Sequence, residues 1–296
     1  MIFSASLIFV VLSTAYEVTS NIQNREKNQL YCAFSIYSNS KIIMTMKSLS
    51  GREMTFLHGI RSLAIMWIVL CHTYVLYWMK PLVNTNEYFN WIQKYTSMIP
   101  FGGYFAVDTF FLMSAMLLSL SFFRELDKSK RINIFGLYIK RYFRITVPMA
   151  ACILFVLSFY YYVSNGPLWN FYMQIMVIDN CEKWWWTSLL YVSNYVNPGK
   201  ICLTHFWYLI IDMQFYILSP IILYPIWRYQ KIKWFTYPLI LAIASISVIY
   251  VFLISMKHGL RISLISETVS ERDFFIYYNI LARIDSWMMG ILTGFI

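Results

Sequence analysis

Four ionisable side chains lie inside stretches that are otherwise apolar, and they are the residues best placed to do chemistry. Three are acids, Asp108, Asp212 and Asp285, and the fourth is His72. A charged group at membrane depth is costly, so such residues usually face a partner or a water-filled cavity. Imidazole exchanges a proton near neutral pH, which makes His72 a candidate general base.

Arg61 precedes His72 by close to three turns of an α-helix. Both side chains would then project from one helix face, about 16 Å apart along the axis. Such a face would run from a membrane surface to the middle of the bilayer. For an isolated pair, however, the spacing favours an anchoring arginine and a core histidine bonded to a neighbour.

Two further patterns suggest polar contacts between helices. His205, Asp212 and Ser219 recur every seven residues and form a polar stripe on an apolar helix. This stripe fits either the lining of a wet cavity or hydrogen bonding between helices. Arg141 and Arg144 share a helix face. Paired guanidinium groups can hold a phosphate, although orientation at the membrane surface is the commoner reason for such a cluster.

The composition places these residues in a membrane protein. The 296-residue chain is 59% hydrophobic and only 13% charged, whereas soluble domains are about 25% charged. Too few charges remain to cover a water-soluble surface. This excludes an ordinary soluble domain and a disordered chain.

Six stretches are long and apolar enough for membrane-spanning helices. A seventh, Ile2–Tyr16, is short, and is either a signal peptide or the remnant of a longer membrane helix. The sequence therefore predicts an all-α, polytopic integral membrane bundle of about six to seven transmembrane helices. The six longer stretches are Ile60–Trp78, Phe101–Phe123, Ile145–Val163, Phe206–Trp227, Phe235–Ser255 and Phe274–Ile296.

Lysine and arginine are unevenly distributed between the loops. They concentrate before the first long stretch, between the second and third, and after the fourth, so these segments are expected in the cytosol. The net charge of +10 thus indicates topology and contact with membrane lipid, not nucleic acid. Cys181 and Cys202 fall on the opposite, oxidising side, where we expect a disulfide, with two free thiols as the alternative.

Other catalytic signatures are missing from the sequence. It contains no phosphate-binding P-loop, no G-x-S-x-G and no paired C-x-x-C. Its four histidines are too scattered for a metal site, so no metal cofactor is expected.

Five short motifs, in order along the chain, resemble those of the acyltransferase-3 membrane family. Arg61 and His72 match its R-x10-H motif, although Cys71 and Ala115 stand where the family has glycine. The cytosolic stretch Cys32–Lys47 and the loop between Cys181 and Cys202, with Trp184 and Trp185, look like the animal branch called nose resistant to fluoxetine. The motifs lie at Phe56–Tyr74, Gly102–Ser114, Arg141–Arg144, Phe206–Pro220 and Arg283–Gly294.

The resemblance also suggests how the chain is divided. Family members have more spans than are found here, and animal members carry an upstream Cys-rich domain. We therefore interpret the chain as partial relative to the family: a fragment, an incomplete gene model or a shortened paralogue. Residues 1–17 would be the short hydrophobic segment, 18–55 a cytosolic linker, and 56–296 an acyltransferase-3-like transmembrane domain, incomplete at its C-terminus.

The resemblance implies transfer of an acyl group from a cytosolic acyl-CoA donor to a hydroxyl acceptor in or across the membrane. His72 would be the general base, and Asp108 or Asp212 would orient its imidazole. The acceptor is not indicated, and the membrane would be the plasma membrane or the endoplasmic reticulum. The donor's phosphates would be held by three arginines, Arg61, Arg141 and Arg144.

Two other interpretations remain open at this point. The first is a non-catalytic carrier for lipids or hydrophobic small molecules, because a wet stripe and charges at the midplane would also serve transport. The second is an inactive truncated paralogue.

Overall fold

The computed structural model describes residues 2–45, 56–78, 83–166, 169–170, 174–259 and 273–295. These residues form helices and loops, with no strand among them. The prediction of an all-α membrane bundle is confirmed, because five helical stretches are long and apolar enough to cross a membrane, and a shorter apolar helix covers Leu7–Ile22. The five are Phe56–Val75, Tyr95–Ser129, Ile134–Ser158, Phe206–Arg228 and Trp234–His258.

In chain order, the described helices fall into N-terminal, central and C-terminal parts. The N-terminal part contains α1 (Ile2–Ile22), α2 (Ile36–Met44), α3 (Phe56–Trp78), α4 (Thr85–Ile92), η1 (Tyr95–Ser97) and α5 (Met98–Phe101). The central part contains α6 (Gly103–Ser129), α7 (Ile134–Ser158), η2 (Tyr160–Val163), η3 (Gln174–Ile178), α9 (Asp179–Leu189) and α10 (Ser193–Val196). The C-terminal part contains α11 (Phe206–Arg228), α12 (Lys233–His258), η4 (Asp273–Tyr277), η5 (Leu281–Arg283) and α14 (Ile284–Phe295).

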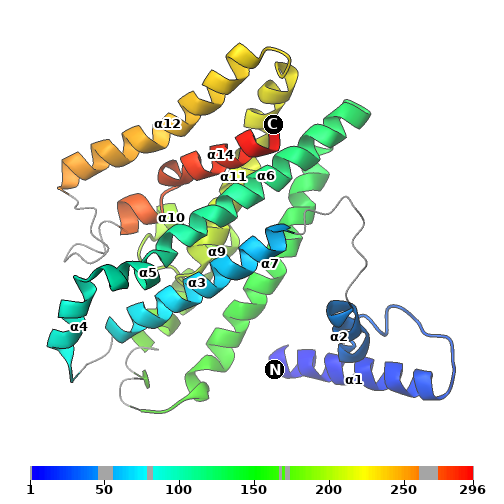
Figure 1. Ribbon diagram of the computed structural model, residues 1–296. Helices are drawn as coiled ribbons and strands as arrows, with labels where there is room; N and C mark the ends of the chain where they lie inside the picture. The colour runs from blue at the N-terminus through cyan, green and yellow to red at the C-terminus, as the bar shows by residue number, and fades with distance from the viewer. Residues whose placement is uncertain are drawn as a thin grey trace.

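Helix α6 lies at the centre of the bundle. Helices α3, α11 and α14 pack against it, and α12 packs on α14 (Figure 1). The tightest part of the core lies between α6, α11 and α14. There Phe111 and Phe215 are fully buried, and the Trp287 ring stacks on Phe215 with 5.0 Å between centroids.

Glycines allow α6 to approach its neighbours closely. Gly290 and Gly294 are one turn apart on α14 and face α6, and a Cβ atom at Gly290 would lie 2.7 Å from the Cβ of Ala115. Gly103 of α6 faces α3 in the same way, because a Cβ atom added there would lie 2.6 Å from the Cβ of Cys71. Small residues at this spacing bring membrane helices into direct backbone contact.

Local chemistry accounts for helix ends and for proline inside α11. Asn133 caps α7 by accepting a hydrogen bond from the Gly136 N–H at 2.9 Å. Pro220 has no N–H to donate to the Tyr216 carbonyl, one turn earlier. The Ser219 hydroxyl donates to that carbonyl instead, at 2.7 Å, so the backbone acceptor is satisfied within the bundle.

Two elements differ from the sequence prediction. Helix α7 begins at Ile134 instead of Ile145, so Lys140, Arg141 and Arg144 belong to this helix and not to a loop. The predicted last span, Phe274–Ile296, is broken. Its continuous part, α14, has 12 residues, which is about 18 Å and too short for a hydrocarbon core of about 30 Å.

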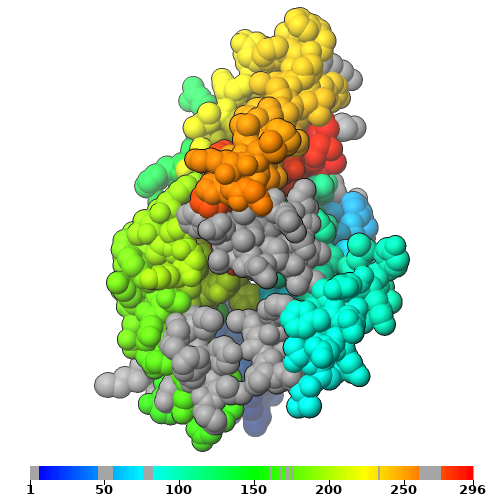
Figure 2. Space-filling model, turned by 90° about the vertical axis from the view of Figure 1, so that its left-hand side faces the viewer, coloured from blue at the N-terminus to red at the C-terminus, as the bar shows by residue number. Residues whose placement is uncertain are grey.

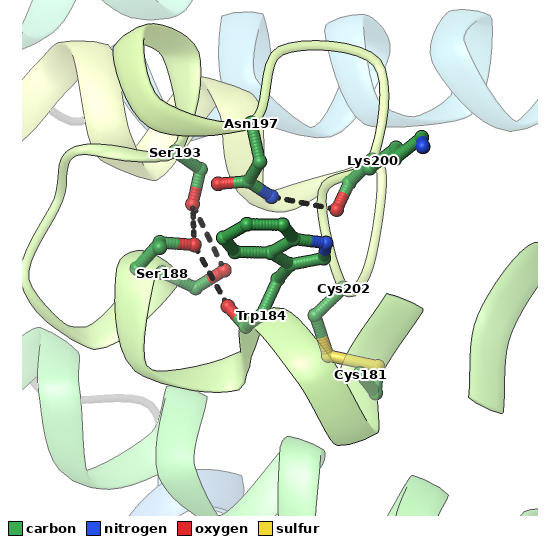
Figure 3. Close-up of a disulfide and its surroundings, with 8 residues drawn as sticks. Cys181, Trp184, Ser188, Ser193, Asn197, Lys200 and Cys202 are labelled. Carbon is green, nitrogen blue, oxygen red and sulfur yellow. Dashed lines mark hydrogen bonds between the residues drawn. A yellow bond between two sulfur atoms is a disulfide. The ribbon is translucent and has the colours of Figure 1, made fainter. Parts of the chain in front are cut away.

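The chain between α7 and α11 folds into a helical cap, which we define as residues 179–205. Cys181 in α9 is joined to Cys202 by a disulfide (Figure 3). The Gln214 side chain of α11 donates to the Tyr191 carbonyl at 2.8 Å, and Thr146 of α7 is hydrogen-bonded to the Tyr191 hydroxyl at 2.9 Å. The cap is therefore fixed to two membrane helices.

The two ends of the bundle differ in character. We call the end that carries the cap the cap face, and the opposite end, where α6 ends and α7 begins, the basic face. The basic face holds Lys128, Lys130, Arg131 and Lys140. Figure 2 looks toward the cap face, with α4 (cyan) on one side and the end of α7 (green) on the other.

Candidate functional site

His72 lies in the half of α3 nearer the cap face and is partly buried. Its Nδ1 atom is 2.8 Å from the carbonyl oxygen of Ile68, one turn earlier on the same helix. A carbonyl oxygen can only accept, so in the neutral ring Nδ1 carries the hydrogen and Nε2 has the free electron pair. The backbone of α3 thus orients the imidazole with Nε2 as its basic nitrogen.

A second histidine faces the first. The His205 ring lies 5.1 Å from the His72 ring, centroid to centroid, with 33° between the planes. His205 is the residue at which the cap passes into α11, and its side chain is exposed and makes no capping hydrogen bond. Although His205 is accessible to solvent, desolvation of its ring by the surrounding protein, and secondarily the neighbouring His72 imidazole, lower its pKa, so its neutral form is favoured.

Asp212 forms the second polar cluster of the site. Its carboxylate is 6% exposed, and it makes an ion pair with Arg141 of α7. The Ser114 hydroxyl of α6 donates to the Asp212 Oδ1 atom at 2.7 Å. The Arg141 guanidinium also lies over the Tyr216 ring, 4.0 Å from its centroid. Asp212 therefore joins α6, α7 and α11 by polar contacts.

Asp108 has a different arginine as its partner. The Arg283 guanidinium donates to both Asp108 oxygens at 3.0 Å, and it lies 4.6 Å from the Tyr277 ring centroid. This pair links α6 to the segment that leads into α14. Both acids predicted to orient His72 thus have arginine partners, and the group that contacts the His72 Nδ1 atom is the Ile68 carbonyl.

The three arginines predicted to hold a donor do not share one environment. Arg61 is partly buried, and Arg144 is exposed. Arg141 of α7 lies against α11, where it contacts Asp212 and the Tyr216 ring. Arg141 is paired, but its Nε atom is buried without a hydrogen-bond partner, so it retains one N–H for a ligand.

These clusters lie at different depths. Asp212 is two turns beyond His205 on α11, which is about 10 Å along the axis. The His72–His205 contact is therefore nearer the cap face, and the Arg141–Asp212 pair is deeper in the bundle. Within the described ranges, no group of three or more His, Cys, Asp or Glu residues is arranged to hold a metal ion.

Several of these contacts were not found from the sequence. The His72–His205 contact joins two residues whose types were noticed but whose helices could not be placed side by side. Ser114 and Arg283 were noticed only as parts of motifs, without a predicted partner. A search for opposite charges at matching membrane depth would have suggested the pairing of Arg283 with Asp108.

The fold and the site define a multi-pass helical membrane protein with a polar, histidine-containing centre. The family model described as an acyltransferase domain, Acyl_transf_3, matches residues 54–294. The chain belongs to this acyltransferase-3 family, so the resemblance predicted from its motifs is confirmed.

Two relatives show how much of a longer protein the chain represents. Nose resistant to fluoxetine protein 6 of Caenorhabditis elegans is 32% identical over 246 residues, which is 74% of this chain and 29% of that protein. O-acetyltransferase OatA of Staphylococcus aureus (strain NCTC 8325 / PS 47) is 26% identical over 179 residues, 60% of this chain and 26% of that protein. The chain thus spans less than a third of either relative. No solved structure matches it.

Proposed function

We propose that this chain carries the catalytic centre of a membrane acyltransferase that uses an acyl-CoA donor and a hydroxyl acceptor. The observation that carries the proposal is the state of His72, a partly buried imidazole whose Nδ1 is held by the Ile68 carbonyl at 2.8 Å. This arrangement presents Nε2 as a general base. Membership of the acyltransferase family and the relative named an O-acetyltransferase support the same class of reaction.

In the proposed reaction, His72 Nε2 takes the proton of the acceptor hydroxyl while the hydroxyl oxygen attacks the acyl carbon. The carbon–sulfur bond of the thioester then breaks, and its electron pair goes to sulfur. The imidazolium returns the proton to the thiolate, which leaves as the free thiol. Proton transfer by a positioned base contributes about 10²–10⁴-fold to such a rate.

The donor would enter from the basic face, where cationic side chains can attract its phosphates. Of the three arginines predicted to bind the donor, Arg61 and Arg144 form no ion pair with a carboxylate among the residues that the structure describes. Arg141 would contribute its positive charge and its Nε–H, while Asp212 holds its terminal nitrogen. We therefore expect loss of Arg61 or Arg144 to weaken donor binding without breaking an internal ion pair.

The first test is donor binding by the purified chain. Acetyl-CoA binding is measured by calorimetry for the wild type, for the Arg61→Ala and Arg144→Ala variants, and for Lys41→Ala as a control outside the transmembrane bundle. Binding that weakens at least tenfold in both arginine variants and is unchanged in Lys41→Ala supports the proposed donor site. No binding by a folded wild type would contradict it.

The second test asks for a covalent product. Proteoliposomes containing the chain receive acetyl-CoA labelled in the acetyl group, and labelled ester and free thiol are measured. The acyltransferase proposal predicts label in an ester and release of one thiol for each ester formed. Passage of a hydrophobic solute without ester would indicate a carrier, and a chain that neither binds nor transfers would be an inactive paralogue.

A further inference from the structure

The segment that leads into His205, which packs against His72, is fixed by a disulfide three residues before the histidine. Cys202 is bonded to Cys181, and both residues are buried, as is Ile201. Hydrogen bonds within the cap hold the partner side of this bridge. The Ser193 hydroxyl is bonded to that of Thr187 at 2.9 Å, and in Figure 3 it also points toward Ser188.

The short stretch between the disulfide and α11 is held by backbone hydrogen bonds and by Leu203, which packs against the core. Thr204 and His205 are exposed, and the His205 side chain makes no capping hydrogen bond. The backbone makes one turn there, with the Phe206 N–H bonded to the Leu203 carbonyl at 2.9 Å. The position of the His205 ring therefore depends on this turn and on the disulfide that anchors it.

His205 in turn packs against the ring that presents the basic nitrogen. The His72 imidazole is held by a hydrogen bond through Nδ1, and it leaves this bond when it rotates about the Cα–Cβ and Cβ–Cγ bonds of its side chain. The His205 ring at 5.1 Å supplies a second contact that limits this rotation. A base held within about 10–20° of its working geometry transfers protons far better than one that rotates.

We propose that His205 is a positioning residue for His72 and that the Cys181–Cys202 disulfide acts on the catalytic centre through His205. This inference rests on the proposed function of His72 as a general base. The disulfide is buried, so we expect it to hold Cys202, and with it the segment before His205, against α9. The cap is accordingly part of the catalytic apparatus, because it sets the orientation of a residue within the membrane bundle.

The test is a comparison of three variants in the proteoliposome transfer assay. They are His205→Ala, the double variant Cys181→Ser/Cys202→Ser, and the combination of all three changes. We expect His205→Ala and the double cysteine variant each to lower kcat about tenfold with unchanged affinity for acetyl-CoA. Because both act through one contact, the combined variant should also fall about tenfold, and not a hundredfold.

His205→Phe separates packing from proton transfer and from general damage to the fold. It keeps an aromatic ring beside His72 and removes the titrating nitrogens, so we expect it to retain at least a third of the wild-type kcat. A Phe variant as slow as the Ala variant would overturn the positioning role. Additive losses in the combined variant would overturn the link between the disulfide and His205.

A measurement independent of activity distinguishes failure of this inference from failure of the proposed function. The chain is labelled with ¹³C in its histidine rings, and the His72 signal is assigned by its absence in His72→Gln. The inference predicts that loss of the disulfide shifts this signal in the wild-type background but not in His205→Ala. If the shift occurs and no acyl transfer is found, the contact stands and the proposed reaction is wrong. An unchanged signal overturns the inference itself.

Discussion

Breaking the Arg141–Asp212 pair tests whether this contact stabilises the bundle. Asp212 is nearly inaccessible, so Arg141→Ala leaves a buried carboxylate that keeps only the Ser114 hydroxyl as a recorded donor. Removal of one partner of a buried ion pair costs about 3–5 kcal/mol, whereas replacement of both by apolar residues is often nearly neutral. We therefore expect Arg141→Ala to lower the free energy of unfolding by about 3–5 kcal/mol, and Arg141→Met/Asp212→Leu to restore most of that loss.

The assay is reversible unfolding in mixed micelles with increasing denaturing detergent, followed by circular dichroism. Arg144→Ala is the matched control, because Arg144 lies one turn further along α7 and is exposed. Its free energy of unfolding should stay within about 0.5 kcal/mol of the wild type. The reasoning is refuted if Arg141→Ala costs less than about 1 kcal/mol, or if the double variant loses the sum of the two single losses.

Two further predictions concern helix packing and pH. Gly290→Leu should lower the free energy of unfolding by about 1–3 kcal/mol, because the leucine side chain would meet the Leu112 backbone at the α6–α14 contact. Gly59→Ala is the control and should not destabilise the protein, because no atom lies within 4 Å of the new Cβ. Equal unfolding curves for the two variants would contradict this prediction. Because the pKa of His205 is lowered in the folded protein, the unfolded chain binds more protons at this residue than the folded chain does below about pH 6.5. The contribution of His205 to the free energy of unfolding should therefore be lost as the pH falls from that value through the folded-state pKa. The melting temperature should fall more in the wild type than in His205→Phe between pH 7.5 and 5.5. An equal fall in the two proteins would contradict the lowered pKa of His205.

The features predictable from the sequence were those set by local spacing and composition. The apolar stretches gave the class of fold, and the helical period placed Arg61 and His72 on one face of α3. The Nδ1 contact of His72 is also local, because Ile68 is one turn away. The Ile68 carbonyl of α3 could therefore have been predicted as the acceptor for His72 Nδ1, ahead of the carboxylates on other helices.

The contacts that could not be predicted join residues far apart in the chain. Asp212 and Arg141 are 71 residues apart, and Asp108 and Arg283 are 175 apart. Their pairing depends on how the helices pack, and one sequence contains many possible charge pairs. The start of α7 was misplaced for a related reason, since its first turns carry basic residues that lower the local hydropathy although they continue the helix.

The central claim is that the His72 Nε2 atom takes the proton of the acceptor hydroxyl. The most direct measurement is the rate of acetyl transfer from acetyl-CoA by His72→Gln in proteoliposomes, beside His58→Gln, which changes an exposed histidine on the same helix. The account predicts a loss of about 10²–10⁴-fold in His72→Gln, with unchanged acetyl-CoA binding and with wild-type transfer by His58→Gln. Transfer by His72→Gln within threefold of the wild type would contradict it.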